Sequence, residues 1–254
     1  MTLLGLGPRG LGFSTCGGSP RVVNLWHSNV TTWGPQAEGF CSPLPHEVLM
    51  ISETHLSHEG AMPVQKRMDF LGWNSFYSAA VPTGRSLSGN SAGVAVFARK
   101  SHMVSPVDSC VIQQAACGAD PMSLRWVAAV LRLRGVSILL VELYLITGIG
   151  ISTCNMEILH QVYVLKSLLN MPVIIAADWQ NIPEQLSSTG WLENCDLVLP
   201  VPNIDTTCTV GGRVIDYFAM SPCLGPLIIS CDADYEVPWG PHCAIHLKIS
   251  GRLR

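Results

Sequence analysis

The chain has 254 residues, of which 48% are hydrophobic and only 13% are charged, and its formal net charge is −3. This length and apolar content suffice for one large domain or two small ones. The slightly negative charge excludes a strongly basic nucleic-acid-binding protein, but not a nuclease whose metal site is built from carboxylates.

The cysteines form no Cys-x-x-Cys pair, so the sequence predicts neither a zinc site nor a disulfide framework. The chain contains ten of them: Cys16, Cys41, Cys110, Cys117, Cys154, Cys195, Cys208, Cys223, Cys231 and Cys243. Several lie in apolar runs, which indicates mostly reduced and buried thiols. Such thiols favour an intracellular location, the nucleus included, over secretion.

The N-terminal segment 1–20 is predicted to be a flexible Gly-rich tail, and 21–254 one domain. Gly5–Gly10 matches a dinucleotide-binding fingerprint in spacing, but no adequate strand precedes it and no helix follows. The segment also lacks the apolar core of a signal peptide. The longest apolar run, Val136–Ile151, carries Glu142 centrally and is short for a membrane span, so it is interpreted as strand.

In the first half of the chain, apolar spacing predicts one short helix and four strands. These are the helix Pro63–Leu71, with Pro63 at its first position, and the strands Arg21–His27, Glu47–Ser52, Ser75–Val81 and Gly93–Arg99. The segment 84–92 is typical of a Gly/Ser loop, and no element is predicted for 101–121. Asn29 and Glu53 follow the ends of the first two strands.

In the second half, Arg134-Gly135 between two apolar runs predicts a hairpin. The further elements are the helix Asn155–Leu169, capped by Ser152 or Thr153, and the strands Val173–Ala177, Val214–Met220 and Cys243–Ile249. The helix would connect two parallel strands as a βαβ crossover. The residues 190–199 form a short apolar piece and 205–213 a Thr-rich loop.

Polar side chains follow or flank several of these strands. They are Asn29, Glu53, Tyr144, Asp178, Asp216 and His242. Carboxylates from three separate strands would repel one another unless a hard cation joins them, and oxygen ligands favour Mg²⁺ or Mn²⁺ over zinc. A zinc site on His242 and His246 is excluded, because a strand would separate the two by about 13 Å.

Each of these residues has a purely structural alternative. Asp178 could cap the following helix, and Asn29 could be a turn residue. Tyr144 could be a core ring, Asp216 could pair with Arg213, and His242 could be a loop histidine. It is their joint occurrence in this order that favours a site.

In its motifs the sequence resembles the endonuclease/exonuclease/phosphatase superfamily, including its retroelement and apurinic endonucleases, from about Val23 to Ile249. The matching segments are Leu25-Trp26-His27-Ser28-Asn29-Val30, Leu49-Met50-Ile51-Ser52-Glu53-Thr54-His55, Gly93-Val94-Ala95-Val96, Leu143-Tyr144-Leu145, Ala177-Asp178-Trp179-Gln180, Arg213-Val214-Ile215-Asp216-Tyr217 and Pro241-His242. The Glu53 motif is the most specific of them. The resemblance implies an α/β fold, a four-layered α/β/β/α sandwich of two mixed sheets.

The resemblance also implies a metal-dependent phosphodiester hydrolase, most simply a DNA endonuclease without membrane or protein partner. Glu53 would bind Mg²⁺ or Mn²⁺ with Asn29 and Asp216. Asp178 would orient or deprotonate the attacking water. Tyr144 and His242 would hold the phosphate.

Two departures from the family pattern bear on activity. Gln180 stands where the family has Asn, which adds a methylene to the amide arm. Pro241 replaces the Asp before the histidine, which predicts that His242 lacks an orienting carboxylate and is less often protonated. These departures keep two alternatives open, a phosphatase of small phosphorylated molecules and an inactive binding module.

Overall fold

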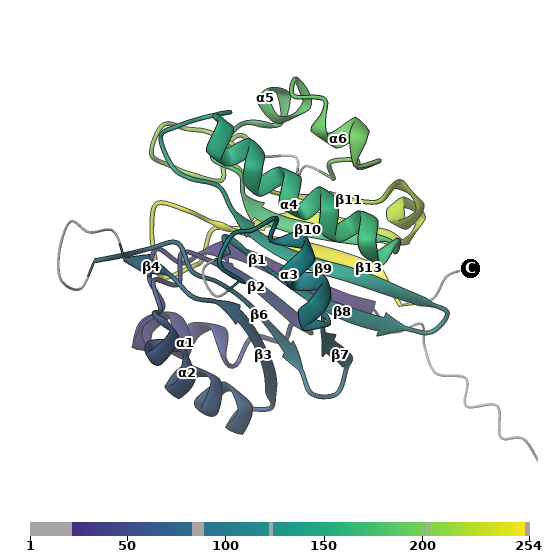
Figure 1. Cartoon of the computed structure of the whole chain (residues 1–254). Coiled ribbons are helices and arrows are strands. Elements are labelled where there is room, and N and C mark those ends of the chain that lie inside the picture. Colours follow the sequence, from purple (N-terminus) through teal and green to yellow (C-terminus); the bar gives the residue numbers. More distant parts are fainter. Residues whose placement is uncertain (1–21, 83–88, 122–123, 201, 203, 252–254) are drawn as a thin grey trace, which may run out of the picture.

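The computed structural model describes residues 22–82, 89–121, 124–200, 202 and 204–251. Two mixed sheets stack face to face, and helices cover their outer faces, as the resemblance implies (Figure 1). The predicted tail, residues 1–20, lies outside the described residues, as does most of the predicted Gly/Ser loop 84–92.

The first sheet has six strands in the order β12-β13-β1-β2-β6-β3. They are β1 (Val22–Asn29), β2 (Val48–Ser52), β3 (Trp73–Ser78), β6 (Val94–Arg99), β12 (Ile228–Asp234) and β13 (Ala244–Ser250). Only the neighbours β1 and β2 are parallel, and they end at Asn29 and Ser52, which are register partners. Glu53 therefore leaves the sheet at the same edge as Asn29.

The second sheet has five strands in the order β11-β10-β9-β8-β7. They are β7 (Met103–Pro106), β8 (Trp126–Leu133), β9 (Val136–Tyr144), β10 (Val173–Asp178) and β11 (Asp216–Met220). The pair β8 and β9 is the predicted hairpin. The parallel strands β9 and β10 are joined by α4 (Thr153–Leu169), whose N-cap is Ser152, which confirms the predicted crossover. A separate two-stranded ribbon consists of β4 (Val81–Pro82) and β5 (Asn90–Ser91).

The helices lie on both outer faces of the sheet pair (Figure 1). The outer face of the first sheet carries α1 (Pro35–Cys41) and α2 (His58–Phe70), and that of the second carries α3 (Ser109–Ala115) and α4. Three short helices come later in the chain: α5 (Pro183–Ser187), α6 (Trp191–Asn194) and the 3-10 helix η2 (Pro222–Leu227). The fully buried β10 packs in the main core, where each buried aliphatic side chain contributes roughly 1.5–3 kcal/mol.

Several predicted elements need correction. Helix α2 begins at His58 and not at Pro63, because Ser57 caps it by accepting a hydrogen bond from Gly60 N, and Pro63 lies inside. Strand β7 and helix α3 lie in the region left unassigned, although Asp108 caps α3 by accepting from Cys110 N. Strand β12 was also missed.

The nine described cysteines are free, as predicted, but only four of them are buried. The four exposed thiols are Cys110, Cys117, Cys154 and Cys223. They belong to helices or loops at the surface, where a short apolar run does not imply burial. Within the described residues, no helix is long and apolar enough to cross a membrane.

Candidate active site at the strand ends

The stacking of the sheets brings predicted site residues from both of them into contact. Asn29 at the end of β1 donates from Nδ2 to Asp178 Oδ2 at the end of β10, over 2.8 Å. The Tyr144 hydroxyl at the end of β9 donates to Glu53 Oε1 after β2. Each contact crosses from one sheet to the other, because both parallel strand pairs end at the same edge of the sandwich.

Asp178 is fully buried and held by three donors. Besides Asn29, Gln180 donates from Nε2 to Oδ2 over 2.7 Å and from its backbone N to Oδ1 over 3.1 Å. Burial and the nearby Asp216 carboxylate nevertheless raise the pKa of Asp178 to about 7, against the pull of His242 and of these hydrogen bonds. Asp178 is thus poised to exchange a proton near neutral pH.

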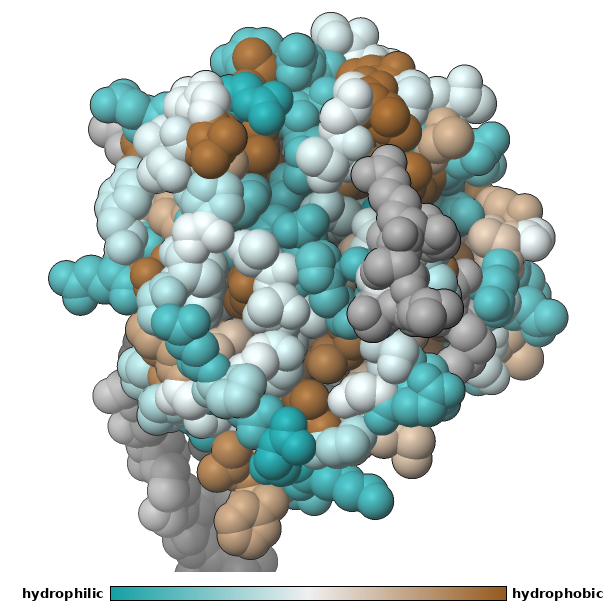
Figure 2. Space-filling view, turned by 90° about the vertical axis from the view of Figure 1, so that its left-hand side faces the viewer, coloured by the Kyte–Doolittle hydropathy of each residue, from teal (hydrophilic) through white to brown (hydrophobic). Residues whose placement is uncertain are grey.

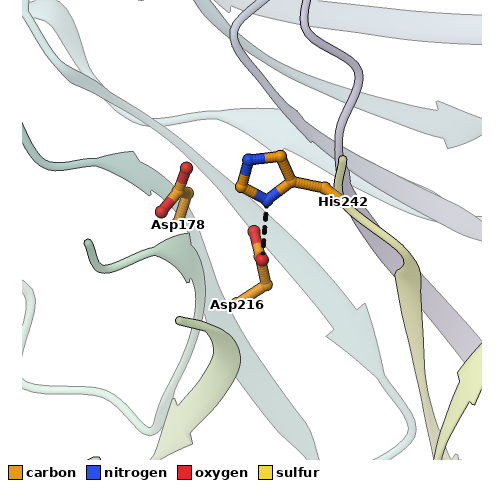
Figure 3. A group of neighbouring side chains, drawn as sticks. All are labelled: Asp178, Asp216 and His242. Carbon is orange, nitrogen blue, oxygen red and sulfur yellow. Dashed lines mark hydrogen bonds and ion pairs between the residues drawn. The ribbon is translucent and has the colours of Figure 1, made fainter. Parts of the chain in front are cut away.

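Asp216 lies beside Asp178 because the two are register partners in the antiparallel pair β10 and β11. Its Oδ2 is 2.8 Å from His242 Nδ1 (Figure 3). Ligand atoms of Asp178, Asp216 and His242 all lie within 4.8 Å of one another. The backbone N–H of Asp216 donates to Thr207 Oγ1 over 2.9 Å, which anchors the start of β11.

The prediction that His242 lacks an orienting carboxylate is wrong. Pro241 carries none, but Asp216 supplies it from another strand. Burial disfavours the imidazolium, yet the hydrogen bond to Asp216 and the charges of Asp216, Asp178 and Glu53 outweigh it and raise the pKa of His242. His242 is therefore more often protonated than a free histidine, with Nε2 left for a ligand.

Glu53 is positioned by an unusual turn after β2. Its φ is +53°, and the next residues return to the sheet through Thr54 N, which donates to Gly93 O over 3.0 Å. A Cβ at Gly93 would collide with Thr54 Oγ1, and Gly93 itself has a φ of +84°, so only glycine permits this approach. The Gly93 segment thus supports Glu53 rather than touching a ligand.

The side-chain amide of Gln180 contacts Asp178, although glutamine is one methylene longer than the Asn of the family pattern. Its φ of +56° turns the backbone so that both of its donors point back to Asp178. The neighbouring Asn181 donates from Nδ2 to Trp179 O instead. The side-chain amide of Gln180 therefore helps to fix the orientation of the Asp178 carboxylate.

Sequence reasoning missed Arg125, which precedes β8. Its guanidinium lies 5.6 Å from the centre of the Tyr144 ring, and the charge of Glu53 acts on it. Its buried Nη1 has no hydrogen-bond partner among the described residues. A guanidinium group with a free, buried N–H donor next to Glu53 and Tyr144 is suited to an anionic ligand. The signal in the sequence was an arginine immediately before a buried apolar strand.

A second omission is the fully buried pair of His27 on β1 and Glu142 on β9. His27 Nδ1 lies 3.1 Å from Glu142 Oε2, and His27 Nε2 lies 3.8 Å from Asp216 Oδ1. Since side chains alternate along a strand, His27 shares a face with Asn29, and Glu142 with Tyr144. On each strand a polar residue lies two positions before a predicted site residue, and this spacing was the signal for a polar layer below the site.

The donor set fits a divalent cation. Glu53 offers a partly exposed carboxylate at the strand edge, while Asp178 and Asp216 lie together beside His242, and hard oxygen ligands of this kind suit Mg²⁺ or Mn²⁺. The mutual repulsion of Asp178 and Asp216, expressed in the raised pKa of Asp178, is also what a cation would relieve. Which of these groups hold the ion stays a prediction.

Among known proteins, matches to this chain were found only among solved structures. No family model and no curated protein matches the sequence. An AP endonuclease, LMAP from Leishmania major, matches with a TM-score of 0.70 at 14% identity, covering 91% of this chain and 88% of that one. The 3′ phosphatase NExo from Neisseria, bound to a product DNA hairpin, matches with a TM-score of 0.64 at 14% identity, covering 90% and 99%.

The endonuclease domain of TRAS1, a telomere-specific non-LTR retrotransposon, also matches. Its TM-score is 0.60 at 16% identity, and the match covers 91% of this chain and 99% of that one. At such identities the likeness establishes the fold alone. Each match covers about nine tenths of this chain.

Proposed function

We propose that this chain, which has the fold of the endonuclease/exonuclease/phosphatase superfamily, is a divalent-metal-dependent phosphodiester hydrolase acting on DNA. The observation that carries the proposal is the meeting of Asp178, Asp216 and His242 at one strand edge, with a buried carboxyl of raised pKa next to an imidazole. This arrangement pairs a proton acceptor with a cationic donor, as hydrolysis of a phosphate ester requires.

Asp178 is the general base in this proposal. Its pKa of about 7 lets it take a proton from an attacking water near neutral pH. Asn29 and Gln180 donate to its oxygens and hold its orientation. They act on the base through these hydrogen bonds.

His242, Tyr144 and Arg125 bind the phosphate. His242 presents the imidazolium form that Asp216 supports. Burial, then Glu53, raise the pKa of Tyr144, so its hydroxyl keeps its single proton at neutral pH. This proton is donated to Glu53 in the structure and would turn to a phosphate oxygen once the Glu53 carboxylate binds the cation. Arg125 adds an unpaired N–H donor beside the Tyr144 ring. Together they stabilise charge that develops on the phosphoryl oxygens.

Glu53 is the residue to which we assign the cation. It is partly exposed, and of its two oxygens Oε1 accepts the Tyr144 hydroxyl. Mg²⁺ retains several water ligands, so a carboxylate at the surface suits it better than Asp216, which is fully buried between two histidines. Asn29 is likewise engaged, with Asp178 and with Thr31 N. When bound, the ion would neutralise and polarise the phosphate.

The test is nicking of supercoiled DNA with Mg²⁺. We expect Asp178→Asn to lower the rate by roughly 10²–10⁴-fold, the usual contribution of general base catalysis. Glu53→Gln should also weaken Mg²⁺ binding measured by calorimetry, whereas Asp216→Asn should leave that binding in place. The matched controls are the exposed residues Asp196 and Glu193, as Asp196→Asn and Glu193→Gln, which should keep full activity.

The alternatives give different results in the same experiment. Phosphate release from a 3′-phosphorylated oligonucleotide or a small phosphomonoester, without nicking, would indicate a phosphatase. A folded protein with neither activity nor Mg²⁺ binding would be an inactive module and would overturn the proposal. Nicking that persists unchanged in Asp178→Asn would come from another source.

A further inference from the structure

A row of ionisable groups crosses the core between the two sheets. It runs from Glu142 on β9 through His27 on β1 and Asp216 on β11 to His242 before β13. The successive contacts are 3.1 Å, 3.8 Å and 2.8 Å. Three members, Glu142, His27 and Asp216, have no exposed surface at all.

Burial of such a row costs free energy of folding, so a structural role alone does not explain it. Burying an ionised group costs several kcal/mol even after relaxation, and an apolar pair of similar size is often equally stable. The surroundings are apolar: Phe218 stands edge-on to the His27 ring, with ring centroids 6.2 Å apart. Leucine side chains at positions 27 and 142 would fit the same core. The pair is therefore better explained by what it does to Asp216.

The geometry on the Asp216 side is specific. Asp216 Oδ1 and His27 Nε2 are both buried and lie 3.8 Å apart, and neither atom has a hydrogen-bond partner among the described residues. Asp216 Oδ2 accepts from His242 Nδ1. One oxygen thus faces His27 and the other faces His242, so a rotation of the carboxylate would disturb both contacts.

His27 is in turn held by Glu142. Burial opposes the imidazolium, but attraction to Glu142, the hydrogen bond to Glu142 and attraction to Asp216 outweigh it and raise the pKa of His27 to about 10. His27 therefore keeps one charge state through the neutral range. No proton needs to move along the row.

We propose that His27, braced by Glu142, is a positioning residue that fixes the Asp216 carboxylate in the orientation that supports His242. This proposal rests on the proposed function for its effect on catalysis, but the geometry at His242 can be measured without any activity. Loss of His27 would free Asp216 to rotate away or take up a proton beside Asp178, and its hydrogen bond to His242 would weaken.

The test compares the wild-type protein with His27→Leu/Glu142→Leu. Histidine ring signals are followed by NMR against pH without metal, and the His242 signal is assigned by its loss in His242→Asn. The proposal expects the His242 pKa to fall by about one unit in the double variant, since a charge-assisted hydrogen bond is weakened. In the DNA-nicking assay kcat should fall about 10–100-fold with KM nearly unchanged, by analogy with residues that orient metal ligands.

The conservative variant is Glu142→Gln. Its amide can donate to His27 Nδ1 and leave Nε2–H to Asp216, so activity should stay within about threefold of wild type. The matched control is His246→Leu. His246, a histidine of the same sheet, is partly buried and pairs with Asp234, but it is the register partner of Trp26 and so lies on the opposite face from His27.

An unchanged or raised His242 pKa in the double variant would overturn the proposal, whatever the activity. If the double variant does not fold, His27→Asn replaces it, because its amide is too short to reach Asp216, and the same shift is required. A lowered His242 pKa in a chain that hydrolyses no phosphate ester would support the positioning role and count against the proposed function alone.

Discussion

At the residue scale, the site consists of charged groups that alter each other's affinity for protons. Asp178 and Asp216 repel, and each imidazole lies next to an acid: His242 next to Asp216, and His27 between Asp216 and Glu142. The sequence indicated Asp178, Asp216 and His242 among these groups, but not His27 or Glu142. Their pairing could not be predicted, because one carboxylate at Asp216 was equally compatible with a cation, with Arg213 or with a histidine.

The buried His27–Glu142 pair predicts a specific dependence of stability on pH. The folded-state pKa of His27 is raised to about 10 from an ordinary 6.5, so the folded state binds the extra proton between these values. Stability from His27 is therefore fully present below about pH 6.5 and lost as the pH rises through about 10, by on the order of a few kcal/mol. Glu142, raised to about 7, acts in the same direction at lower pH.

Urea unfolding at about pH 6.5 and pH 9.5 measures this effect. The wild-type protein should lose stability over the interval, and the His27→Leu/Glu142→Leu variant should lose much less because it lacks both groups. Equal losses in the two proteins would show that His27 does not hold its proton in the folded state.

At the scale of elements, the site depends on how strands and helices end. Predicted strand ends were right to within about two residues for β1, β2 and β10, since their apolar runs stop abruptly at polar residues. Errors occurred where the signals conflict. Pro63 suggested a helix start, but the Ser57 cap lies six residues earlier, and the proline lies in the second turn, where it removes one backbone hydrogen bond without ending the helix.

The loop after Tyr144 is held by Asn155 in the first turn of α4. Its Nδ2 donates to Ile146 O over 3.1 Å and to Gly150 O over 2.8 Å, and its Oδ1 accepts from Ile146 N over 2.7 Å. The side chain is fully buried. It therefore satisfies three backbone groups that would otherwise be left without partners.

We expect Asn155→Ala to lower the free energy of unfolding by about 2–4 kcal/mol, because buried backbone groups lose their partners. Chemical denaturation measures the loss. DNA nicking should also weaken, since Tyr144 lies at the base of the loop. The control Glu157→Ala, at an exposed position of the same helix, should change stability by less than about 0.5 kcal/mol. A similar loss in both variants would refute this role of Asn155.

At the scale of the whole molecule, the balance of charge limits how DNA can be bound. The chain has 15 Lys and Arg against 18 Asp and Glu. The face on which β4 lies shows hydrophobic residues scattered among hydrophilic and intermediate ones over its coloured part (Figure 2). Binding should therefore depend on a few donors at the strand edge, Arg125 and His242 among them, more than on a broad basic surface.

This balance predicts weak salt dependence of DNA binding. With about two phosphate contacts, the slope of log K against log salt should be no steeper than about −2, so affinity falls less than about 20-fold between 50 and 200 mM salt. Fluorescence anisotropy with a duplex oligonucleotide and the Asp178→Asn variant measures the slope. Lys66→Ala, on the exposed side of α2, should not change it. A slope near −6 would contradict the prediction.

Local patterns in the sequence were enough to predict the strands that lead to Asn29, Tyr144 and Asp178, and most residue types of the site. Periodicity and strand termination are local, so neighbouring residues suffice to predict them. The partners came only with the fold: Asn29 meets Asp178 across 149 positions of sequence, His27 meets Glu142 across 115, and Asp216 meets His242 across 26. Those contacts depend on how two sheets stack and in which register their strands pair, and no local pattern specifies either.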